Sequence, residues 1–384
     1  MPKISSNKVF REHPAQRTDR TKVNPRKPVE VVVVGGGPAG ATTALLLART
    51  GISIVLLEAS EGTTQRIGET LPPVANRLLH DLSLWNAFYK QKHHVSEGIV
   101  STWTNDEPQV SDFFLSAQGA GWNLDRKRFD TMLLEECEKA GAVVCRPSKL
   151  FSCNRTDDRR WLLDFDRNDC RHRVVARYLV DATGKAGAGP LRNLSQRLVL
   201  DRLIGVAKFV PCADRSRYTI VEAVDNGWFY SASLPHSRVA VMYFTDADIY
   251  SARRKSDPDY WSTQLKKARH TRDRLGDAAI PHELTIVSAA TTRRIRFSGE
   301  DWIAVGDAAQ SFDPLSSLGI YKALDSATRA FDFVLNTMNK NRSDASYANW
   351  SEQVFNHYKQ RHAEYYRSQR RWPGSKFWER RRIA

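Results

Sequence analysis

The sequence predicts an α/β fold in which a parallel-stranded unit is interrupted by an antiparallel β-sheet and followed by a helical C-terminal tail. Three observations support this class. Residues 29–60 read as strand, Gly-rich turn, helix and strand. Between residues 204 and 245, β-rich segments follow one another without a helical pattern. Residues 301–307 then return to a buried strand, with a helical pattern after it. The sequence therefore predicts a discontinuous, two-domain organisation.

This pattern divides the 384 residues into four parts. We expect a flexible basic arm, a discontinuous nucleotide-binding domain, an inserted substrate domain and a C-terminal helix with an aromatic and basic tail. The arm covers residues 1–28, and the nucleotide-binding domain covers 29–98, 126–185 and 297–344. The substrate domain covers 99–125 and 186–296, and the C-terminal helix and tail cover 345–384. A helix is expected over 126–140. The C-terminal helix is expected to bury one face, formed by Tyr347, Trp350, Val354, Tyr358 and Tyr365.

The formal net charge of +15 is concentrated at the two ends of the chain. Residues 1–28 hold eight Lys or Arg and two Asp or Glu, and residues 367–384 hold seven and one. The body is close to neutral, so we expect no nucleic-acid partner. No long apolar run or secretory signal occurs, which predicts no membrane span. The five cysteines lack a C-x-x-C pair, which favours reduced thiols in a cytoplasmic protein without a metal site.

The stretch "GGGPAG" follows a continuous Val run and opens a helix, which is the Rossmann-like context of a dinucleotide-binding turn. Its glycines allow a tight turn, close approach of the backbone to a pyrophosphate, and close packing of helix on strand. An acid ends the next strand, where it can accept hydrogen bonds from ribose hydroxyls. The residues predicted to hold the dinucleotide here are Gly35, Gly37, Pro38, Ala39, Gly40 and Glu58.

A second Gly-Asp turn, "GDAAQSFDPLSSLG", occurs late in the chain. An enzyme that binds only a nicotinamide dinucleotide does not need it, whereas an extended flavin dinucleotide can be closed over by a late strand, turn and helix. We therefore predict FAD as the cofactor. The helix beginning near Ser317 and Gly319 would direct its positive end at the flavin ring. Gly306, Asp307 and Pro314 complete the predicted residues of this motif.

These two motifs and the "DATG" between them, from Asp181 to Gly184, occur in an order that resembles FAD-dependent monooxygenases of the p-hydroxybenzoate hydroxylase fold. The resemblance implies an FAD-binding domain of the glutathione reductase type. "WNLDRKRFDTMLLEEC" is similar to the family segment whose Arg, matching Arg126, reaches the FAD. "RIGETLPP", which begins at Arg66, resembles a segment of the flavin halogenase branch. The resemblance thus adds Arg66, Arg126, Asp181 and Gly184 to the predicted cofactor-binding residues.

The halogenase branch has two further markers, and this sequence departs from both. Tyr230 and Ala232 stand where the marker Trp-x-Trp-x-Ile-Pro has its two tryptophans. Arg77 stands where a catalytic Lys is expected, and an arginine is a poor proton donor. The resemblance therefore favours oxygenation over halogenation. No residue is singled out as an acid or a base.

The tail "YYRSQRRWPGSKFWERR" resembles the LodB- and GoxB-like flavoproteins that help to mature cysteine tryptophylquinone enzymes. The resemblance implies a monooxygenase that uses O₂ to hydroxylate a specific tryptophan of a protein partner, the precursor of a tryptophylquinone-containing amino-acid oxidase. Alternatively, the tail only packs against the FAD domain. Two other functions stay open: a non-oxygenating FAD-binding maturation chaperone, because "SSLG" replaces a common Gly-x-Gly loop, and a flavin halogenase or geranylgeranyl-reductase-like oxidoreductase acting on a small substrate.

Overall fold

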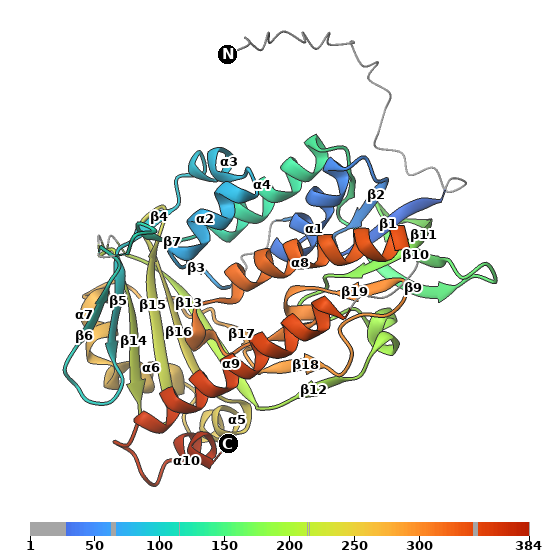
Figure 1. The fold of residues 1–384 in the computed structure, drawn as a ribbon. Coiled ribbons are helices and arrows are strands. Elements are labelled where there is room, and N and C mark those ends of the chain that lie inside the picture. The colour runs from blue at the N-terminus through green and yellow to red at the C-terminus, as the bar shows by residue number, and fades with distance from the viewer. Residues whose placement is uncertain are drawn as a thin grey trace, which may run out of the picture.

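The structure is a computed structural model that describes residues 28–62, 67–114, 116–212, 214, 216–340 and 345–383. The basic arm predicted over residues 1–28 falls, apart from Pro28, outside this range, and so does Arg66. Figure 1 shows two large sheets at opposite ends of an elongated molecule, with the helices α8 (Gly319–Lys340) and α9 (Ser346–Ser368) running between them.

The first sheet is built on the predicted parallel strands. In spatial order it contains β8 (Val143–Cys145), β2 (Ile54–Leu57), β1 (Val29–Val34), β11 (Cys170–Asp181), β10 (Trp161–Arg167) and β9 (Lys149–Arg155), and β19 (Trp302–Ala304) pairs with the end of β11. The pairs β8–β2, β2–β1, β1–β11 and β11–β19 are parallel, and β9 and β10 extend the sheet in antiparallel fashion. The Val run of β1 is fully buried at Val31–Val33, as expected for a strand covered on both faces.

Three helices cover this sheet and position the late motif against the early one. The helix α1 (Pro38–Arg49) packs against both α4 (Arg126–Lys139) and α8. The helix predicted over 126–140 is thus confirmed as α4, and the helix predicted after the late motif is confirmed as α8. Two shorter helices, α2 (Val74–Asp81) and α3 (Trp85–Tyr89), pack against each other, and α2 also contacts α8.

The second sheet confirms the antiparallel sheet predicted between residues 204 and 245. Its strand order is β17 (Thr285–Ser288), β13 (Leu203–Pro211), β16 (Arg238–Asp246), β15 (Gly227–Leu234), β14 (Tyr218–Val224), β5 (Gly98–Thr102) and β6 (Gln109–Asp112). All neighbours are antiparallel except β14 and β5, which run parallel. The edge strand β17 and the pair β5–β6 come from segments outside the predicted run.

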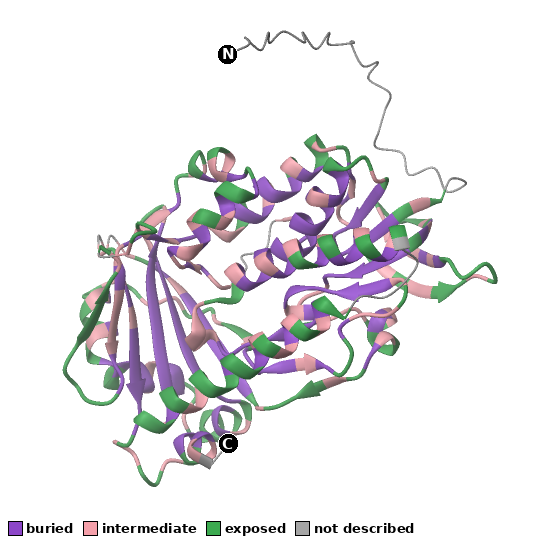
Figure 2. Ribbon diagram, in the orientation of Figure 1, coloured by how far each residue is buried: buried purple, intermediate pink, exposed green. Residues whose placement is uncertain are grey.

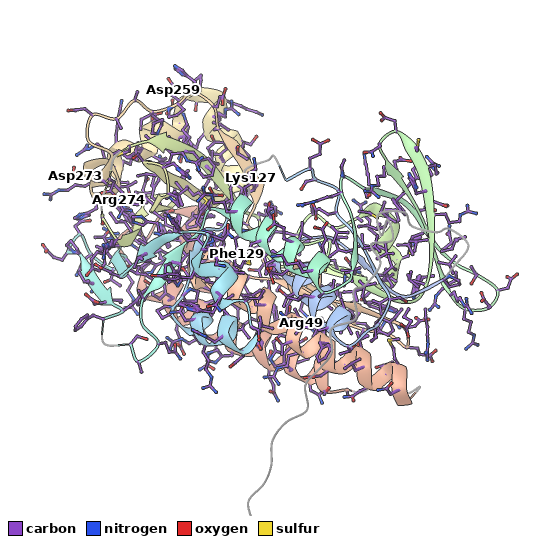
Figure 3. The ribbon with its side chains drawn as sticks, turned by 90° about the horizontal axis from the view of Figure 1, so that it is seen from above. Arg49, Lys127, Phe129, Asp259, Asp273 and Arg274 are labelled. Atoms are coloured by element: carbon purple, nitrogen blue, oxygen red, sulfur yellow. The ribbon has the colours of Figure 1, made fainter. Side chains whose placement is uncertain are left out.

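Both faces of the second sheet are covered. Nearly every residue of the central strands β15 and β16 is therefore buried (Figure 2), although successive side chains point to opposite faces of the sheet. One face, with Val206, Phe229 and Val241, packs on α5 (Ala247–Ser256), α6 (Tyr260–Lys267) and α7 (Arg269–Leu275). Seen from above, α7 with Arg274 lies well away from α4 with Phe129 (Figure 3). We call the first sheet with its helices the first unit, and the second sheet with its helices the second unit. The other side of the second sheet is turned toward the first unit and the C-terminal helices, and it presents Ala207, Trp228, Tyr230, Met242 and Phe244.

The C-terminal tail packs on this second sheet, so the interpretation that it packs against the FAD domain is wrong. Phe377 and Trp378 of α10 (Lys376–Ile383) are fully buried in one cluster with Trp228 and Tyr366. The predicted buried face of α9 is also wrong at its end, because Tyr365 is 41% exposed and Tyr366 is buried. The reason is that α9 passes from the core of the first unit to the second sheet, which lies on a slightly rotated side of the helix.

Short elements join the two units. One small sheet contains β3 (Thr70–Leu71), β7 (Gly121–Asn123) and β4 (His94–Ser96), and a second contains β12 (Arg197–Val199), β18 (Thr292–Arg294) and β20 (Gln310–Ser311). In the described part of the chain, 3₁₀ helices span Gly189–Leu194, Gly306–Ala308 and Pro314–Ser316. Within the described ranges all five cysteines are free, no His, Cys, Asp and Glu cluster is suited to a metal ion, and no helix is long and apolar enough to cross a membrane.

Candidate functional site

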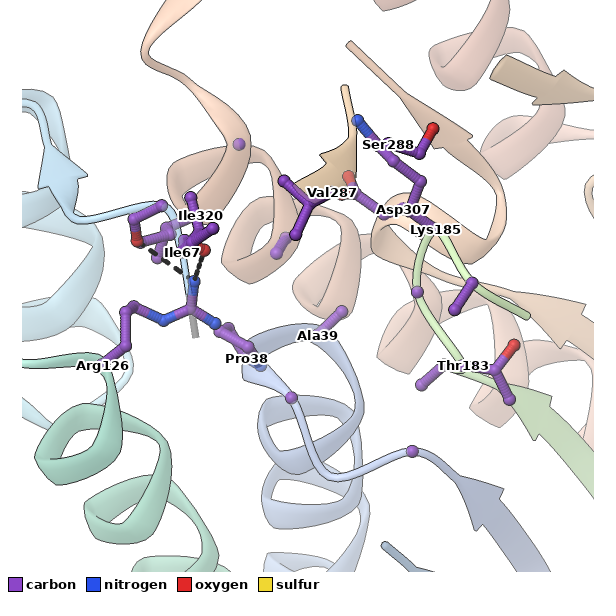
Figure 4. A pocket seen from close by; sticks show the side chains of 18 of the residues that line it. Pro38, Ala39, Ile67, Arg126, Thr183, Lys185, Val287, Ser288, Asp307 and Ile320 are labelled. Carbon is purple, nitrogen blue, oxygen red and sulfur yellow. Dashed lines mark hydrogen bonds between the residues drawn. The ribbon is translucent and has the colours of Figure 1, made fainter. Parts of the chain in front are cut away.

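A cavity of about 870 Å³ lies between the Gly-rich turn of the first unit and the inward face of the second sheet. Its walls come from segments far apart in the sequence (Figure 4). Pro38 and Ala39 lie at the start of α1, Arg126 projects from α4, Asp307 belongs to the late motif and Ile320 to the first turn of α8. The volume falls within the range of cofactor and ligand pockets.

Glycines are required where the early turn meets the sheet. Gly35 has a φ of +110°, and a Cβ there would lie 2.2 Å from the carbonyl oxygen of Ala182. A Cβ on Gly40 would lie 2.0 Å from the carbonyl oxygen of Gly35, so helix α1 can sit this close only without that side chain. Gly35 and Gly37 line the cavity, whereas Gly40 lies behind the wall. Gly35 and Gly40 are therefore placed where the predicted tight turn and helix packing need them.

The start of α1 and the end of β2 together present groups suited to phosphate and ribose. Gly37 is the N-cap residue and offers no capping side chain, so the amides of the first turn remain for an anionic ligand. Glu58 lines the cavity, and its two carboxylate oxygens accept hydrogen bonds from Gly36 N at 2.6 Å and Ser60 N at 3.0 Å. These bonds fix the carboxylate beside the turn.

The late motif closes the cavity from the opposite side. Gly306 has a φ of +57°, and a Cβ there would lie 2.7 Å from the Cβ of Ala39, so the two motifs touch at this point. Asp307 lines the cavity and accepts a hydrogen bond from Lys322 Nζ at 3.1 Å. Burial alone would raise the pKa of Asp307, but the charges of Lys322 and Lys185 outweigh it and hold this pKa below its ordinary value.

The amino end of α8 faces the same cavity, as predicted for the helix of the late motif. Pro314, Ser317 and Gly319 line it. Ser317 adopts a left-handed conformation with a φ of +50°, which turns the chain into the helix at Gly319. Since α8 is a 22-residue helix, its positive end is available to a group that gains negative charge at this wall.

Arg126 lines the cavity, but its guanidinium also holds the loop before β3. Its Nη1 donates to the carbonyl oxygens of Ile67 at 3.0 Å and Gly68 at 3.1 Å, and its Nη2 pairs with Asp130 at 3.1 Å. Arg126 therefore fixes the segment that carries Glu69 in addition to lining the cavity.

Of the predicted "DATG" residues, the structure brings only part to the cavity. Gly184 lines it, together with Thr183 and Lys185. Asp181 is completely buried behind the wall, where its carboxylate pairs with Arg294 and accepts a hydrogen bond from Thr183 N at 3.1 Å. The described contacts of Asp181 thus anchor the loop and do not reach the cavity. Gly306 likewise shapes the turn from behind the wall.

The far part of the cavity is apolar and belongs to the second sheet. Tyr230, Met242 and Phe244 line it from β15 and β16. The hydroxyls of Tyr230 and Thr70 share a hydrogen bond at 2.6 Å, which joins this sheet to β3 of the first unit. An extended ligand can therefore have its polar end at the Gly-rich turn and its ring beside an apolar, partly aromatic wall.

Sequence reasoning missed several charged residues at this site, among them Glu69 and Lys185, which line the cavity, and Lys322, which pairs with Asp307. Glu69 lines the cavity, is only 2% exposed, and neither of its carboxylate oxygens has a hydrogen-bond partner. Lys322 is 4% exposed, and its ammonium group lies 4.1 Å from the ring centre of Phe312. For Lys322 a signal was available, because it precedes Ser326 by one helical turn on the buried face of α8. For Glu69 a signal was also available, because it lies within "RIGETLPP", the segment that resembles the flavin halogenase branch.

The Gly-rich turn, in which a Cβ at Gly35 or Gly40 would collide with the backbone, the Glu58 carboxylate and the second helix terminus fit an extended dinucleotide with a ring at its far end. Together the fold and the cavity define an FAD-dependent oxidoreductase. The chain belongs to the FAD binding domain family, which matches residues 28–353. The predictions of an FAD cofactor and of this fold are thereby confirmed.

Individual relatives agree with this assignment. A protein of Marinomonas mediterranea described as an FAD-dependent oxidoreductase, LodB, is 30% identical over 92% of this chain and 96% of its own length. The flavin-dependent halogenase CmlS superposes with a TM-score of 0.85 at 25% identity, covering 94% of this chain and 68% of CmlS. The peptidyl tryptophan dihydroxylase QhpG superposes with a TM-score of 0.71 at 24% identity, covering 92% and 79%. The predicted resemblance to LodB-like flavoproteins is confirmed.

Proposed function

We propose that this flavoprotein is a monooxygenase that uses O₂ to hydroxylate a specific tryptophan of a partner protein, the precursor of a tryptophylquinone-containing amino-acid oxidase. The observation that carries the proposal is the continuity of one cavity from the dinucleotide turn to an apolar face with Tyr230, Met242 and Phe244. An indole is electron-rich and needs orientation and exclusion of water more than activation. This apolar face offers both.

The chain's own residues position the two reactants. The early turn, Glu58 and the start of α8 hold the cofactor, and FAD, when bound, supplies the electrons that activate O₂. Met242 and Phe244 provide a flat apolar wall for a ring, and they keep water from it. The residues proposed to contact FAD are Gly35, Gly37, Pro38, Ala39, Glu58, Arg126, Gly184, Asp307, Pro314, Ser317 and Gly319, all of which line the cavity. Gly40, Asp181 and Gly306 are proposed to support them from behind.

A protein substrate needs a route from the surface to the cavity, and the edge of the second sheet offers one. The edge strand β17 contributes Thr285, Val287 and Ser288 to the cavity wall. Ile286, between them, is 46% exposed. The wall therefore reaches the molecular surface at this strand, where a tryptophan side chain carried on a partner could enter.

The relatives support the same class of reaction. LodB covers almost the whole chain, and QhpG is named as a peptidyl tryptophan dihydroxylase essential for tryptophylquinone cofactor biogenesis. The position where halogenases are expected to carry a catalytic lysine supports oxygenation over halogenation. Arg77 occupies it, and the side chain is 82% exposed, pairs with Asp81 and lies outside the cavity lining.

Co-expression with a candidate precursor tests the proposal. A precursor of a tryptophylquinone-containing amino-acid oxidase is purified and weighed intact after expression with the wild-type chain, with Gly37→Val, which blocks the cofactor turn, or alone. We expect a gain of oxygen mass, mapped to one tryptophan, with the wild type only. A stable complex between the wild-type holoprotein and a precursor of unchanged mass would favour the non-oxygenating maturation chaperone instead.

A further inference from the structure

Glu69 is a buried carboxyl without a partner, placed where the two units meet. Its backbone is fixed, because its carbonyl oxygen accepts a hydrogen bond from Leu124 N at 2.8 Å. Its side chain lines the cavity and is 2% exposed, and neither carboxylate oxygen is hydrogen-bonded within the described residues. Buried carboxyls are normally paired, so an unpaired one in the wall of a ligand cavity indicates a functional demand.

The polar side chains around Glu69 are directed elsewhere, although the backbone amides of Gly68 and Glu69 lie near its carboxylate. Arg126, from α4, gives its hydrogen bonds to the carbonyl oxygens of the 67–68 segment and to Asp130. Tyr230, from β15, shares its hydroxyl hydrogen bond with Thr70. These two residues are the charged and titratable groups that act on Glu69 in the described structure, and neither is hydrogen-bonded to it.

A second unpaired polar group lies beside the first. Asn123 on β7 stands directly opposite Thr70 on β3, and it is completely buried with both amide atoms unpaired. The seam between the two units thus contains a carboxyl and an amide that the protein itself leaves without partners. Only Glu69 of these two lines the cavity, so a bound ligand with polar atoms at this end of the cavity would supply the partner of Glu69.

We propose that Glu69 is a catalytic acid–base that exchanges protons with the reacting groups in the cavity. The proposal deepens the hydroxylation proposed above and rests on it. In that reaction one atom of O₂ is bonded to a ring carbon and the other leaves as water, while an external reductant supplies two electrons by way of the flavin. Neutral Glu69 donates a proton to the oxygen that leaves as water. Its carboxylate then takes the proton that the ring carbon loses, so the carboxyl ends each cycle as it began.

The electrostatic surroundings suit this role. Burial raises the pKa of Glu69 to about 7, and the nearby Arg126 and the backbone amides of Gly68 and Glu69 oppose only part of this increase. Around neutral pH both the neutral and the ionised form are therefore populated, as a group that must both give and accept a proton requires. Arg126 has a fixed charge, and the hydroxyl of Tyr230 stays neutral in this range because burial raises its pKa.

The test compares Glu69→Gln with Glu107→Gln, an exposed glutamate of the second unit that does not line the cavity. Infrared difference spectra of the FAD-loaded protein are recorded across neutral pH without any partner protein. We expect a protonated-carboxyl band that titrates near pH 7 in the wild type and in E107Q and is missing in E69Q. Absence of that band in the wild type, or its survival in E69Q, would overturn the assignment whether or not the precursor is a substrate.

A kinetic measurement completes the test. With a precursor that the wild type oxygenates, E69Q is expected to lower the rate of oxygen insertion at saturating precursor by roughly 10²-fold or more, with an unchanged KM, while E107Q behaves as the wild type. Glu69→Asp, which keeps a carboxyl, should recover part of the rate of oxygen insertion and the dependence of that rate on pH. A full rate in E69Q, or a loss confined to KM, would contradict the acid–base role and leave the proposed hydroxylation intact.

Discussion

The titration of Glu69 should be visible in the stability of the FAD-free protein. Burial raises the pKa of this carboxyl from 4.5 to about 7 in the folded chain. A carboxyl that binds its proton more tightly when folded contributes stability that is complete below its unfolded pKa and is lost as the pH rises through its folded pKa. Neutralising it with Glu69→Gln, which has nearly the same shape, removes this dependence.

The size of the effect follows from the shift. A rise of about 2.5 pKa units at roughly 1.36 kcal/mol per unit corresponds to about 3 kcal/mol. The wild type should therefore lose about 3 kcal/mol relative to E69Q as the pH increases from about 4.5 to just above 7. His93 titrates in the same region, but it is present in both proteins and cancels in the difference.

Urea unfolding of both FAD-free proteins, followed by tryptophan fluorescence from about pH 5 to about pH 8, measures this difference. The free energies of unfolding should be similar at the acid end and diverge toward the alkaline end, where E69Q is the more stable protein. A difference that stays constant across this range would refute the reasoning, because it would mean that Glu69 is not held neutral by burial.

Three further predictions concern the cofactor cradle, the tail and the acid limit. Gly40→Val, whose side chain would collide with the Gly35 carbonyl, should abolish FAD retention, measured as flavin absorbance per protein; normal retention would contradict the packing described. Trp378→Ala should lower the free energy of unfolding in urea by about 3–5 kcal/mol. Phe114→Ala, at a site 90% exposed, should leave it almost unchanged. Equal losses in the two variants would argue against a tail that stabilises the fold by packing. Burial lowers the pKa of His93 from 6.5 to about 4. The free energy of unfolding should therefore fall as the pH decreases between these values, and it should fall less in His93→Gln. Identical profiles of unfolding free energy against pH in the two proteins would contradict this.

Much of the fold could be predicted because local patterns coincide with it. The Val run of β1, the turn glycines and the late Gly-Asp motif each have a backbone requirement that few residues meet. Gly35 and Gly40, for example, are required by contacts below 2.5 Å that any Cβ would make. The antiparallel sheet followed from a succession of β-rich segments without an intervening helical pattern.

The parts that could not be predicted depend on contacts between distant segments. Asp181 is paired with Arg294, far along the chain, so its motif alone did not show that it lies behind the cavity wall. Tyr366 is buried in place of Tyr365 because α9 changes packing partner along its length. Glu69 became a candidate only through the burial that three-dimensional packing imposes.

The most direct test of the central claim is a single turnover with heavy-isotope O₂. The purified holoprotein, reduced chemically, is mixed with the unmodified precursor and heavy O₂, and the precursor is then digested and weighed. We predict incorporation of the heavy isotope at one tryptophan, with none when FAD is omitted. A precursor that remains unlabelled although it is bound and the reduced flavin is reoxidised would contradict the assignment as a tryptophan monooxygenase.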